Sequence, residues 1–445
     1  MSRFGSLADT PASFLLAGAR VIDPAQREDA VRDVAVLEGR IVDPGELPDG
    51  VRRIEGGDLV AAPGLCDLHT HLREPGGEVA ETIESGTNAA AHGGFTTICA
   101  MPNTEPPLDE RARVAAVNGY PGPTRVRVVA AATRGRAGER LTDYAELAAQ
   151  GVVGVSDDGA AIADPRLARG ALAYLAELGL PLIEHAEETS LAAGTLMRSG
   201  PMATRLGLSG WPPSAELTIV ERDIALAAET GGWVHFTHLS TAGGLDAVRR
   251  AKERSLRVTC DVTPHHLALT DAWVGGHRGF AWDEVGEPNF ERAYDGATRV
   301  NPPLPSREDA LALLGGLVDG SIDAIATDHA PHPPERKLVE FAAAAPGIIG
   351  LETALSLGLA AVEAGCLGLV RLVEAISSGP AGLIGETRGL SIGQVADLVV
   401  FDPVARWRVE ANALASRSAN TPLLGLELPG VVQLTVAVGR MTYEA

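Results

Sequence analysis

Two histidines, His69 and His71, stand one residue apart at the end of the apolar run "LVAAPGLCDLHTHL". Side chains alternate in direction along a β-strand, so both imidazoles project from the same face if this run is a strand. A pair with this spacing can bind one metal ion through both rings. The same pair can also be two hydrogen-bonded polar residues at the mouth of a barrel, so the rest of the chain must decide between these interpretations.

Further histidines and carboxylates end other apolar runs. His185, His238 and Asp328 each close one run, and Asp157 or Asp158 closes another. Four histidines and two carboxylates at one end of a sheet are enough for two metal ions that share a bridging group. Zinc suits such ligands. Neighbouring strand residues face opposite ways, so only one of Asp157 and Asp158 can reach the metals, and the apolar pattern leaves both open.

The remaining polar residues near these runs are weaker candidates. We expect His235 to face away from the metals and to pack. His92 precedes two glycines and is expected to stabilise the carbonyl groups at a helix C-terminus. Asp67 is expected to orient a metal ligand rather than to bind metal. For His265 and His266, packing and contact with a ligand or substrate remain equally open.

Short apolar runs alternate with Ala/Leu-rich stretches of helical periodicity from about residue 58 onward. The eight runs are "LVAAPGLCDLHTHL", "GFTTICAMPN", "RVRVVAAAT", "GVVGVSDDG", "LPLIEHAE", "GWVHFTHLS", "LRVTCDVTPHH" and "SIDAIATDHAP". Such alternation predicts an α/β protein with a parallel sheet, and eight units predict a (β/α)8 TIM barrel. Polar residues end most of these runs, where a barrel of this kind carries its active site.

The two ends of the chain have a different pattern, with short β-type runs and turn signals. We expect them to form one small β-sandwich beside the barrel. The predicted boundaries are residues 1–61 and 385–445 for the two parts of the sandwich and 62–384 for the barrel. Residues 187–213 and 271–300 interrupt the alternation and are expected to be long loops near the active face.

Composition limits the possible partners. The chain has 445 residues, with 37 Lys and Arg against 58 Asp and Glu, for a net charge of −21. This charge argues against binding to nucleic acid or to an anionic membrane. The four cysteines, Cys66, Cys99, Cys260 and Cys366, form no CxxC pair and are expected to be buried free thiols. With no secretory leader pattern and no apolar run of about 18 residues, a cytoplasmic protein is expected.

At this point an ordered series of motifs resembles a known family. The chain reads "DLHTHLREPG", "GGFTTICAMPNTEPP", "SDDG", "HAEE", "THLST", "TPHHL", "NPPL", "DAIATDHAPH" and "GIIGLETAL" in this order. The series is similar to that of the class I dihydroorotases of the amidohydrolase superfamily. The resemblance implies reversible, zinc-dependent cyclisation of N-carbamoyl-L-aspartate to L-dihydroorotate in de novo pyrimidine (UMP) biosynthesis.

The resemblance also implies roles for particular residues. The metal ligands would be His69, His71, Asp158, His185, His238 and Asp328, and the family's spacing favours Asp158 over Asp157. One or two zinc ions are expected per subunit, with a binuclear centre as the expectation. Arg73, Asn103 and His332 would bind the substrate carboxylate, and Asn301 would contact the ring amide. The chain departs from the family in reading "AAPGIIG" where Pro-Phe-Gly often precedes "GLET", so the contacts of this loop are open.

The implied mechanism is attack of a metal-bound hydroxide on the ring carbonyl. Asp328 would act as general acid and base, because it can take a proton from the nucleophile and deliver it to the leaving nitrogen. Arg73 lies two residues past His71, where a guanidinium can bind a carboxylate through two hydrogen bonds. The alternative for Arg73 is a structural ion pair with Glu74 or Glu78.

Lysines separate the possible relatives. Hydantoinases and allantoinases bridge two metals with a carboxylated lysine on strand four, but this chain has only Lys252 and Lys337, and neither lies near that strand. A dihydroorotase is therefore favoured over a hydrolase of another cyclic ureide. A third possibility is an inactive subunit that scaffolds aspartate transcarbamoylase, which is disfavoured because all six ligand positions are kept. A homodimer is expected, and association with aspartate transcarbamoylase remains open.

Overall fold

The eight apolar runs form the parallel strands of a nearly closed barrel in the computed structural model, which describes residues 10–284, 286 and 289–445. A bridge between Thr70 and His329 brings the last strand back to the first. The predicted α/β barrel is therefore confirmed. In pairing order the strands are β15 (Ala324–Ile325), β14 (Val258–Val262), β13 (Trp233–Phe236), β10 (Pro181–Glu184), β9 (Gly154–Ser156), β8 (Arg125–Ala131), β7 (Phe95–Ala100) and β6 (Leu65–Thr70).

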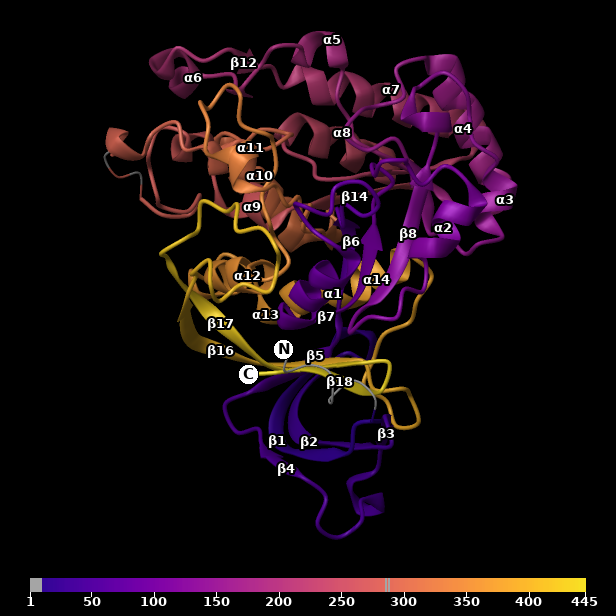
Figure 1. Ribbon diagram of the computed structural model, residues 1–445, viewed down its shortest axis with the longest axis vertical. Coiled ribbons are helices and arrows are strands. Elements are labelled where there is room, and N and C mark those ends of the chain that lie inside the picture. Colours follow the sequence, from indigo (N-terminus) through magenta and orange to yellow (C-terminus); the bar gives the residue numbers. More distant parts are fainter. Residues whose placement is uncertain (1–9, 285, 287–288) are drawn as a thin grey trace.

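The barrel strands are buried on both faces, as their continuous apolar runs predict. Every residue of β6, β7 and β10 is buried. Helices surround the strands in the upper part of the molecule (Figure 1). The helices are α1 (Ile83–His92), α2 (Arg111–Val117), α3 (Tyr144–Ala148), α4 (Pro165–Leu178), α5 (Thr189–Ala192), α6 (Pro201–Leu206), α7 (Ser214–Thr230), α8 (Ala242–Glu253), α9 (Pro264–Ala268), α10 (Arg307–Asp319), α11 (Pro334–Lys337), α12 (Ala354–Glu363), α13 (Leu369–Val373) and α14 (Gly379–Leu383).

Local sequence signals define the ends of the longer helices. The Asp164 side chain accepts a hydrogen bond from the Arg166 N–H at 2.8 Å and caps the start of α4. This helix ends at Gly179, whose φ of 70° lies in the left-handed region that glycine tolerates. In the described part of the chain, no helix is both long enough and apolar enough to cross a bilayer.

The two ends of the chain build one sheet beside the barrel. Its strands are β1 (Phe14–Asp23), β2 (Glu28–Leu37), β3 (Arg40–Val42), β4 (Arg53–Glu55), β5 (Val60–Pro63), β16 (Leu398–Arg408), β17 (Glu427–Ala437) and β18 (Arg440–Glu444). The sheet folds over its own apolar core, so β1 and β2 lie below β5 and β18 in Figure 1. The β domain expected from both termini is confirmed, and its exact boundaries stay predictions.

This terminal sheet continues directly into the barrel. Strand β5 pairs with β1 on one side and with β16 on the other, so it joins the N-terminal and C-terminal contributions. It ends at Pro63, and β6 begins at Leu65. The strand that carries His69 is therefore anchored at its start by the terminal sheet.

The two predicted long loops contain short regular elements. Residues 187–213 include α5, α6 and the paired strands β11 (Met197–Arg198) and β12 (Gly210–Trp211). Residues 271–300 include single 3-10 turns, and positions 285, 287 and 288 of this loop lie outside the described residues. The Tyr294 hydroxyl donates a hydrogen bond to the Leu206 carbonyl at 2.9 Å, which joins the two loops. Residues 1–9 also lie outside the described part.

The cysteines carry no disulfide within the described residues, which include all four. Cys66, Cys99 and Cys260 are buried as predicted. Cys366 is half-buried, because it follows α12 at the outer surface of the barrel, so its predicted burial is wrong.

Candidate metal centre and active site

Six side chains, carried by five strands and the residues just after them, meet at one end of the barrel. All are buried, with 1–5% of each residue exposed. His69 lies on β6, and the other five follow the ends of β6, β9, β10, β13 and β15; they are His71, Asp158, His185, His238 and Asp328. The structure therefore brings together all six residues that the sequence singled out as candidate metal ligands.

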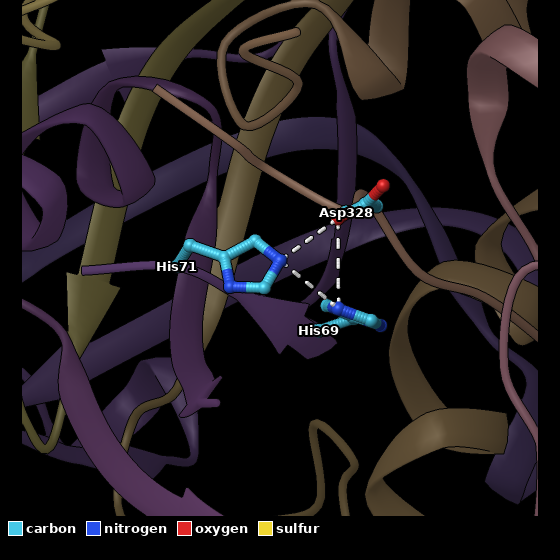
Figure 2. A group of neighbouring side chains, drawn as sticks. All are labelled: His69, His71 and Asp328. Atoms are coloured by element: carbon cyan, nitrogen blue, oxygen red, sulfur yellow. Dashed lines mark hydrogen bonds and ion pairs between the residues drawn. The ribbon is translucent and has the colours of Figure 1, made fainter. Parts of the chain in front are cut away.

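One group consists of His69, His71 and Asp328, which Figure 2 shows with their nitrogen and oxygen atoms turned toward one another. The Nε2 atoms of the two histidines are 3.2 Å apart. Asp328 Oδ1 lies 3.1 Å from His71 Nε2 and 3.5 Å from His69 Nε2. Three such donor atoms within 4.8 Å of one another can bind one metal ion.

A second group lies beside the first and shares His69 with it. Asp158 Oδ1 is 3.3 Å from His69 Nε2 and 3.8 Å from both His185 Nδ1 and His238 Nε2. The last two nitrogens are 3.1 Å apart. Asp158 Oδ2 also lies 3.6 Å from His71 Nε2, so this carboxylate stands between the two groups.

Asp157 points away from this centre. Its carboxylate accepts a hydrogen bond from the Thr133 N–H at 2.9 Å and another from the Thr133 hydroxyl. The alternation of strand side chains thus directs Asp158 inward, where the family's spacing had favoured it.

The donor set fits a metal ion. Asp158 Oδ1 is buried and has no hydrogen-bond partner among the described residues. A buried carboxylate oxygen without a hydrogen bond is costly, and a cation held by the surrounding nitrogens removes that cost. Imidazole and carboxylate ligands together suit zinc.

The electrostatics favour positive charge at the centre. Burial opposes a charge on His69, yet Asp158 and Asp328 together raise its pKa to about 10. Burial likewise opposes charge on the two carboxylates, but His69 and the other imidazoles hold the pKa of each below its usual range. The carboxylates therefore stay ionised at neutral pH, and the site attracts protons or metal cations.

A buried carboxylate that the sequence reasoning missed holds two of the histidines. His69 Nδ1 lies 2.8 Å from Thr237 Oγ1, and this hydroxyl donates to Asp261 Oδ2 at 3.2 Å. Because the hydroxyl proton goes to Asp261, His69 donates from Nδ1, which leaves Nε2 as the nitrogen that faces the centre. Asp261 Oδ1 also accepts the His238 N–H at 2.7 Å.

His235 belongs to the same network, so the prediction that it only packs is wrong. Its Nε2 lies 2.9 Å from Asp261 Oδ2, and its Nδ1 lies 2.9 Å from Thr259 Oγ1. The error arose from extending strand alternation to His238, because β13 ends at Phe236 and His238 has a φ of 40°. His235 and Thr237 both contact Asp261, which joins them in this network.

Both predicted substrate-binding asparagines lie against histidines of the centre. Asn103 Oδ1 is 2.8 Å from His71 Nδ1, and its Nδ2 donates to Asp158 Oδ2 at 3.3 Å. Asn301 Nδ2 is 3.3 Å from His185 Nε2. Each asparagine thus lies beside a candidate ligand and borders the space where a substrate would bind.

Arg73 is half-buried and has no carboxylate partner among the described residues. Its Nε donates to the Pro331 carbonyl at 3.2 Å, and no carboxylate of the described residues lies within 4.0 Å of its guanidinium. The predicted alternative partners are engaged elsewhere, because Glu74 accepts the Ile83 N–H and Glu78 accepts the Gly76 N–H, both at 2.8 Å.

His332 lies near this guanidinium. Burial and the positive charge of Arg73 lower the pKa of His332 to about 3, so its imidazole is neutral at pH 7. Its Nε2 lies 2.8 Å from the Pro346 carbonyl, which can only accept, and therefore carries the ring proton. Nδ1 is the nitrogen that remains for a ligand.

Asp67 and His266 act on the backbone near the centre. Asp67 accepts from the Thr327 N–H and hydroxyl, each at 2.7 Å, and so fixes the chain just before Asp328. His266 Nε2 lies 3.0 Å from the Pro302 carbonyl and so supports the turn after Asn301.

Two more histidines complete this comparison. Burial lowers the pKa of His92 to about 4, so at neutral pH it has no charge with which to stabilise the end of α1. His265 is buried, and its Nε2 has no hydrogen-bond partner among the described residues. The sequence alternatives for His265 stay open.

Backbone strain is concentrated at the site. Of the nine non-glycine residues with positive φ in the described chain, three are Arg73, His238 and Asp328, with φ of 60°, 40° and 47°. Each such residue costs about 1–3 kcal/mol and persists where the surroundings hold it. Hydrogen bonds to Asp261 hold the backbone at His238, and hydrogen bonds to Asp67 hold the chain just before Asp328.

A cavity of about 160 Å³ lies beside His185 and Asn301. Both long loops contribute to its walls, as predicted for loops near the active face. The lining includes Glu187, Trp211, Arg299, Asn301 and Pro346. The Trp211 indole N–H donates to Glu187 at 3.2 Å and holds one wall in place.

Comparison with known proteins agrees with the motif series. A family model described as "Dihydro-orotase-like" matches residues 58–243. The dihydroorotase of Anaeromyxobacter sp. (strain K) is 46% identical over 434 residues, which cover 96% of this chain and 97% of that protein. The dihydroorotase of Geobacter sp. (strain M21) is 42% identical over 440 residues, which cover 97% and 100%.

Among solved structures, L-hydantoinase (dihydropyrimidinase) from Arthrobacter aurescens has a TM-score of 0.82 at 23% identity, covering 97% of this chain and 96% of that one. This likeness concerns the fold, which is shared by barrels with a flanking β domain. Sequence identity above 40% along nearly the whole chain relates this chain more specifically to the two dihydroorotases. The chain belongs to the dihydroorotase family of cyclic amide hydrolases.

Proposed function

We propose that this chain is a zinc-dependent dihydroorotase that interconverts L-dihydroorotate and N-carbamoyl-L-aspartate in de novo pyrimidine biosynthesis. The observation that carries the proposal is the half-buried guanidinium of Arg73, which has no carboxylate partner within the described residues. A partly desolvated charge without a partner is unfavourable, and an anionic ligand group would remove that cost. Dihydroorotate carries a carboxylate on its ring, and the names of the curated relatives support this substrate.

Three side chains would bind that carboxylate. Arg73 can donate two parallel hydrogen bonds from its guanidinium. Asn103 can add its Nδ2, whose 3.3 Å contact with Asp158 is a long one. His332 can join them through Nδ1 when protonated, and the negative charge of a bound carboxylate would raise its pKa from about 3 toward that state. Asn301 would contact the ring amide.

The metal would be held by the six residues described above. His69, His71 and Asp328 would hold metal as one group, and His185 and His238 as the other, with Asp158 between the two groups. When bound, zinc lowers the pKa of a water molecule to about 7 and polarises a carbonyl group.

Asp328 would move the proton. Its carboxylate is 3.1 Å from His71 Nε2 and stays ionised at neutral pH, so it can accept a proton from the attacking water. The same group would then deliver the proton to the ring nitrogen that leaves. In the direction of ring closure, Asp328 would donate a proton to the hydroxyl group that leaves as water.

The positions of the lysines support an aspartate bridge over a carboxylated lysine. Lys252 Nζ donates to the Asp323 carboxylate at 2.6 Å. Lys337 Nζ donates to the carbonyls of Arg299, Ala345 and Gly347 at 3.2, 2.8 and 2.9 Å. Homodimerisation, association with aspartate transcarbamoylase and a cytoplasmic location stay predictions.

The first prediction concerns the bridge. Asp158→Asn should lower the zinc content of the purified protein from about two ions to about one or none, because a neutral amide is a poor ligand for two cations. Metal analysis by mass spectrometry measures this directly. Asp157→Asn is the matched control and should keep its zinc, since the Asp157 carboxylate is bonded to Thr133 and not to the histidines. Equal zinc loss in both variants would contradict the assignment.

The second prediction concerns the carboxylate site. Arg73→Lys should raise KM for L-dihydroorotate by about 10–100-fold, because lysine cannot make the double hydrogen bond. Zinc content should stay unchanged. Arg134→Lys, at an exposed position after β8, should leave both quantities unchanged. Parallel loss of zinc and substrate affinity in Arg73→Lys would assign the residue a structural role instead.

The third prediction concerns proton transfer. Asp328→Asn should reduce kcat by about 10²–10⁴-fold, since the amide cannot accept the proton. The similar size of asparagine should preserve the fold, which circular dichroism and the thermal midpoint would check. Turnover close to that of the unmodified protein would rule out Asp328 as the general acid and base.

A further inference from the structure

One asparagine from the C-terminal segment, Asn420, contacts the chain that follows β15. Asn420 is 7% exposed and follows β16 by a loop, yet it contacts the chain just after Asp328. Its Oδ1 accepts the His332 N–H at 3.0 Å. Its Nδ2 donates to the Ala330 carbonyl at 3.0 Å and to the Gly347 carbonyl at 3.1 Å.

The loop that Asn420 holds is the one in which this chain departs from its family. The Gly347 carbonyl receives hydrogen bonds from Asn420 and from Lys337 Nζ, at 3.1 and 2.9 Å. Gly347 has a φ of 130°, and a Cβ atom there would lie 2.7 Å from Ala330 Cβ and 3.1 Å from His332 Nε2. The preceding Pro346 carbonyl accepts from the His332 ring. The loop and His332 thus form one hydrogen-bonded unit.

Two buried carboxylates of the barrel hold the segment that carries Asn420. Glu352 accepts the N–H groups of Ala415 and Ser416 at 2.8 and 3.1 Å. Glu81 accepts the Arg417 N–H at 3.1 Å and also contacts the His329 ring at 3.2 Å. Because its own segment is fixed on both carboxylates, Asn420 is a rigid support for the residues it contacts.

We propose that Asn420 is a positioning residue for substrate binding, which rests on the dihydroorotase function proposed above. It fixes the backbone of His332 and the carbonyl of Gly347, so that the His332 ring faces the carboxylate site beside Arg73. Its absence should therefore impair recognition of the substrate carboxylate more than the chemistry at the metals. Lys337 still holds Gly347 when Asn420 is replaced, so the loop keeps one of its two anchors.

The test uses the full-length, zinc-loaded protein. Asn420→Ala should raise KM for L-dihydroorotate about tenfold, with kcat within about twofold and unchanged zinc content. Asn420→Asp keeps the acceptor for the His332 N–H and loses the hydrogen bonds to Ala330 and Gly347. It should also raise KM, and it replaces the alanine variant if that variant folds poorly. Asn118→Ala is the matched control. Asn118, at the end of α2, also donates from its side chain to a backbone carbonyl, that of Gln150, and its loss should leave KM unchanged.

A double-mutant cycle separates positioning from general stability. In a His332→Ala background, Asn420→Ala should add less than about twofold to KM, because its effect passes through His332. If the two substitutions multiply each other's effects on KM, or if kcat and zinc content fall with unchanged KM, the positioning role is overturned. Normal KM in both Asn420 variants would overturn the positioning role and leave the proposed function standing. Absence of dihydroorotate turnover by the unmodified protein would overturn the proposed function and this inference together.

Discussion

Two charged side chains that lack a full set of partners, the Asp158 carboxylate and the Arg73 guanidinium, determine what this site can bind. Asp158 has an oxygen that no described group satisfies, and it faces four imidazoles. Arg73 has a guanidinium without a carboxylate, two residues beyond His71. The first requires a cation and the second requires an anion. A metal ion and a carboxylated substrate satisfy both requirements in neighbouring positions.

The rest of the barrel keeps these charges where they are. Asp261 fixes His69 through Thr237 and holds the strained backbone of His238. Asp67 does the same for the chain leading to Asp328. The contacts with Thr237 and Asp261 turn Nε2 of His69 toward the centre. These buried polar residues therefore orient the residues of the metal centre, while the apolar strands and helices exclude water from the barrel interior.

Much of this arrangement could be predicted from the sequence because its signals are local or periodic. Alternating apolar runs and helices predicted the barrel, and polar residues at the run ends predicted the six residues that meet there. The choice between Asp157 and Asp158 could not be made from the pattern, because both sides of β9 are buried. His235 was misjudged because strand alternation stops at Phe236. Asn420 carries no local signal, since its contacts lie about 70–90 residues away in sequence.

The most direct test of this account compares two substrates of the zinc-loaded protein. L-dihydroorotate and 5,6-dihydrouracil share the ring that is opened and differ in the carboxylate that Arg73 would bind. The account predicts a kcat/KM at least about 100-fold higher for L-dihydroorotate, with ring closure of N-carbamoyl-L-aspartate in the reverse direction. Equal or faster turnover of 5,6-dihydrouracil would contradict it, because the Arg73 guanidinium would then have no role in choosing the substrate.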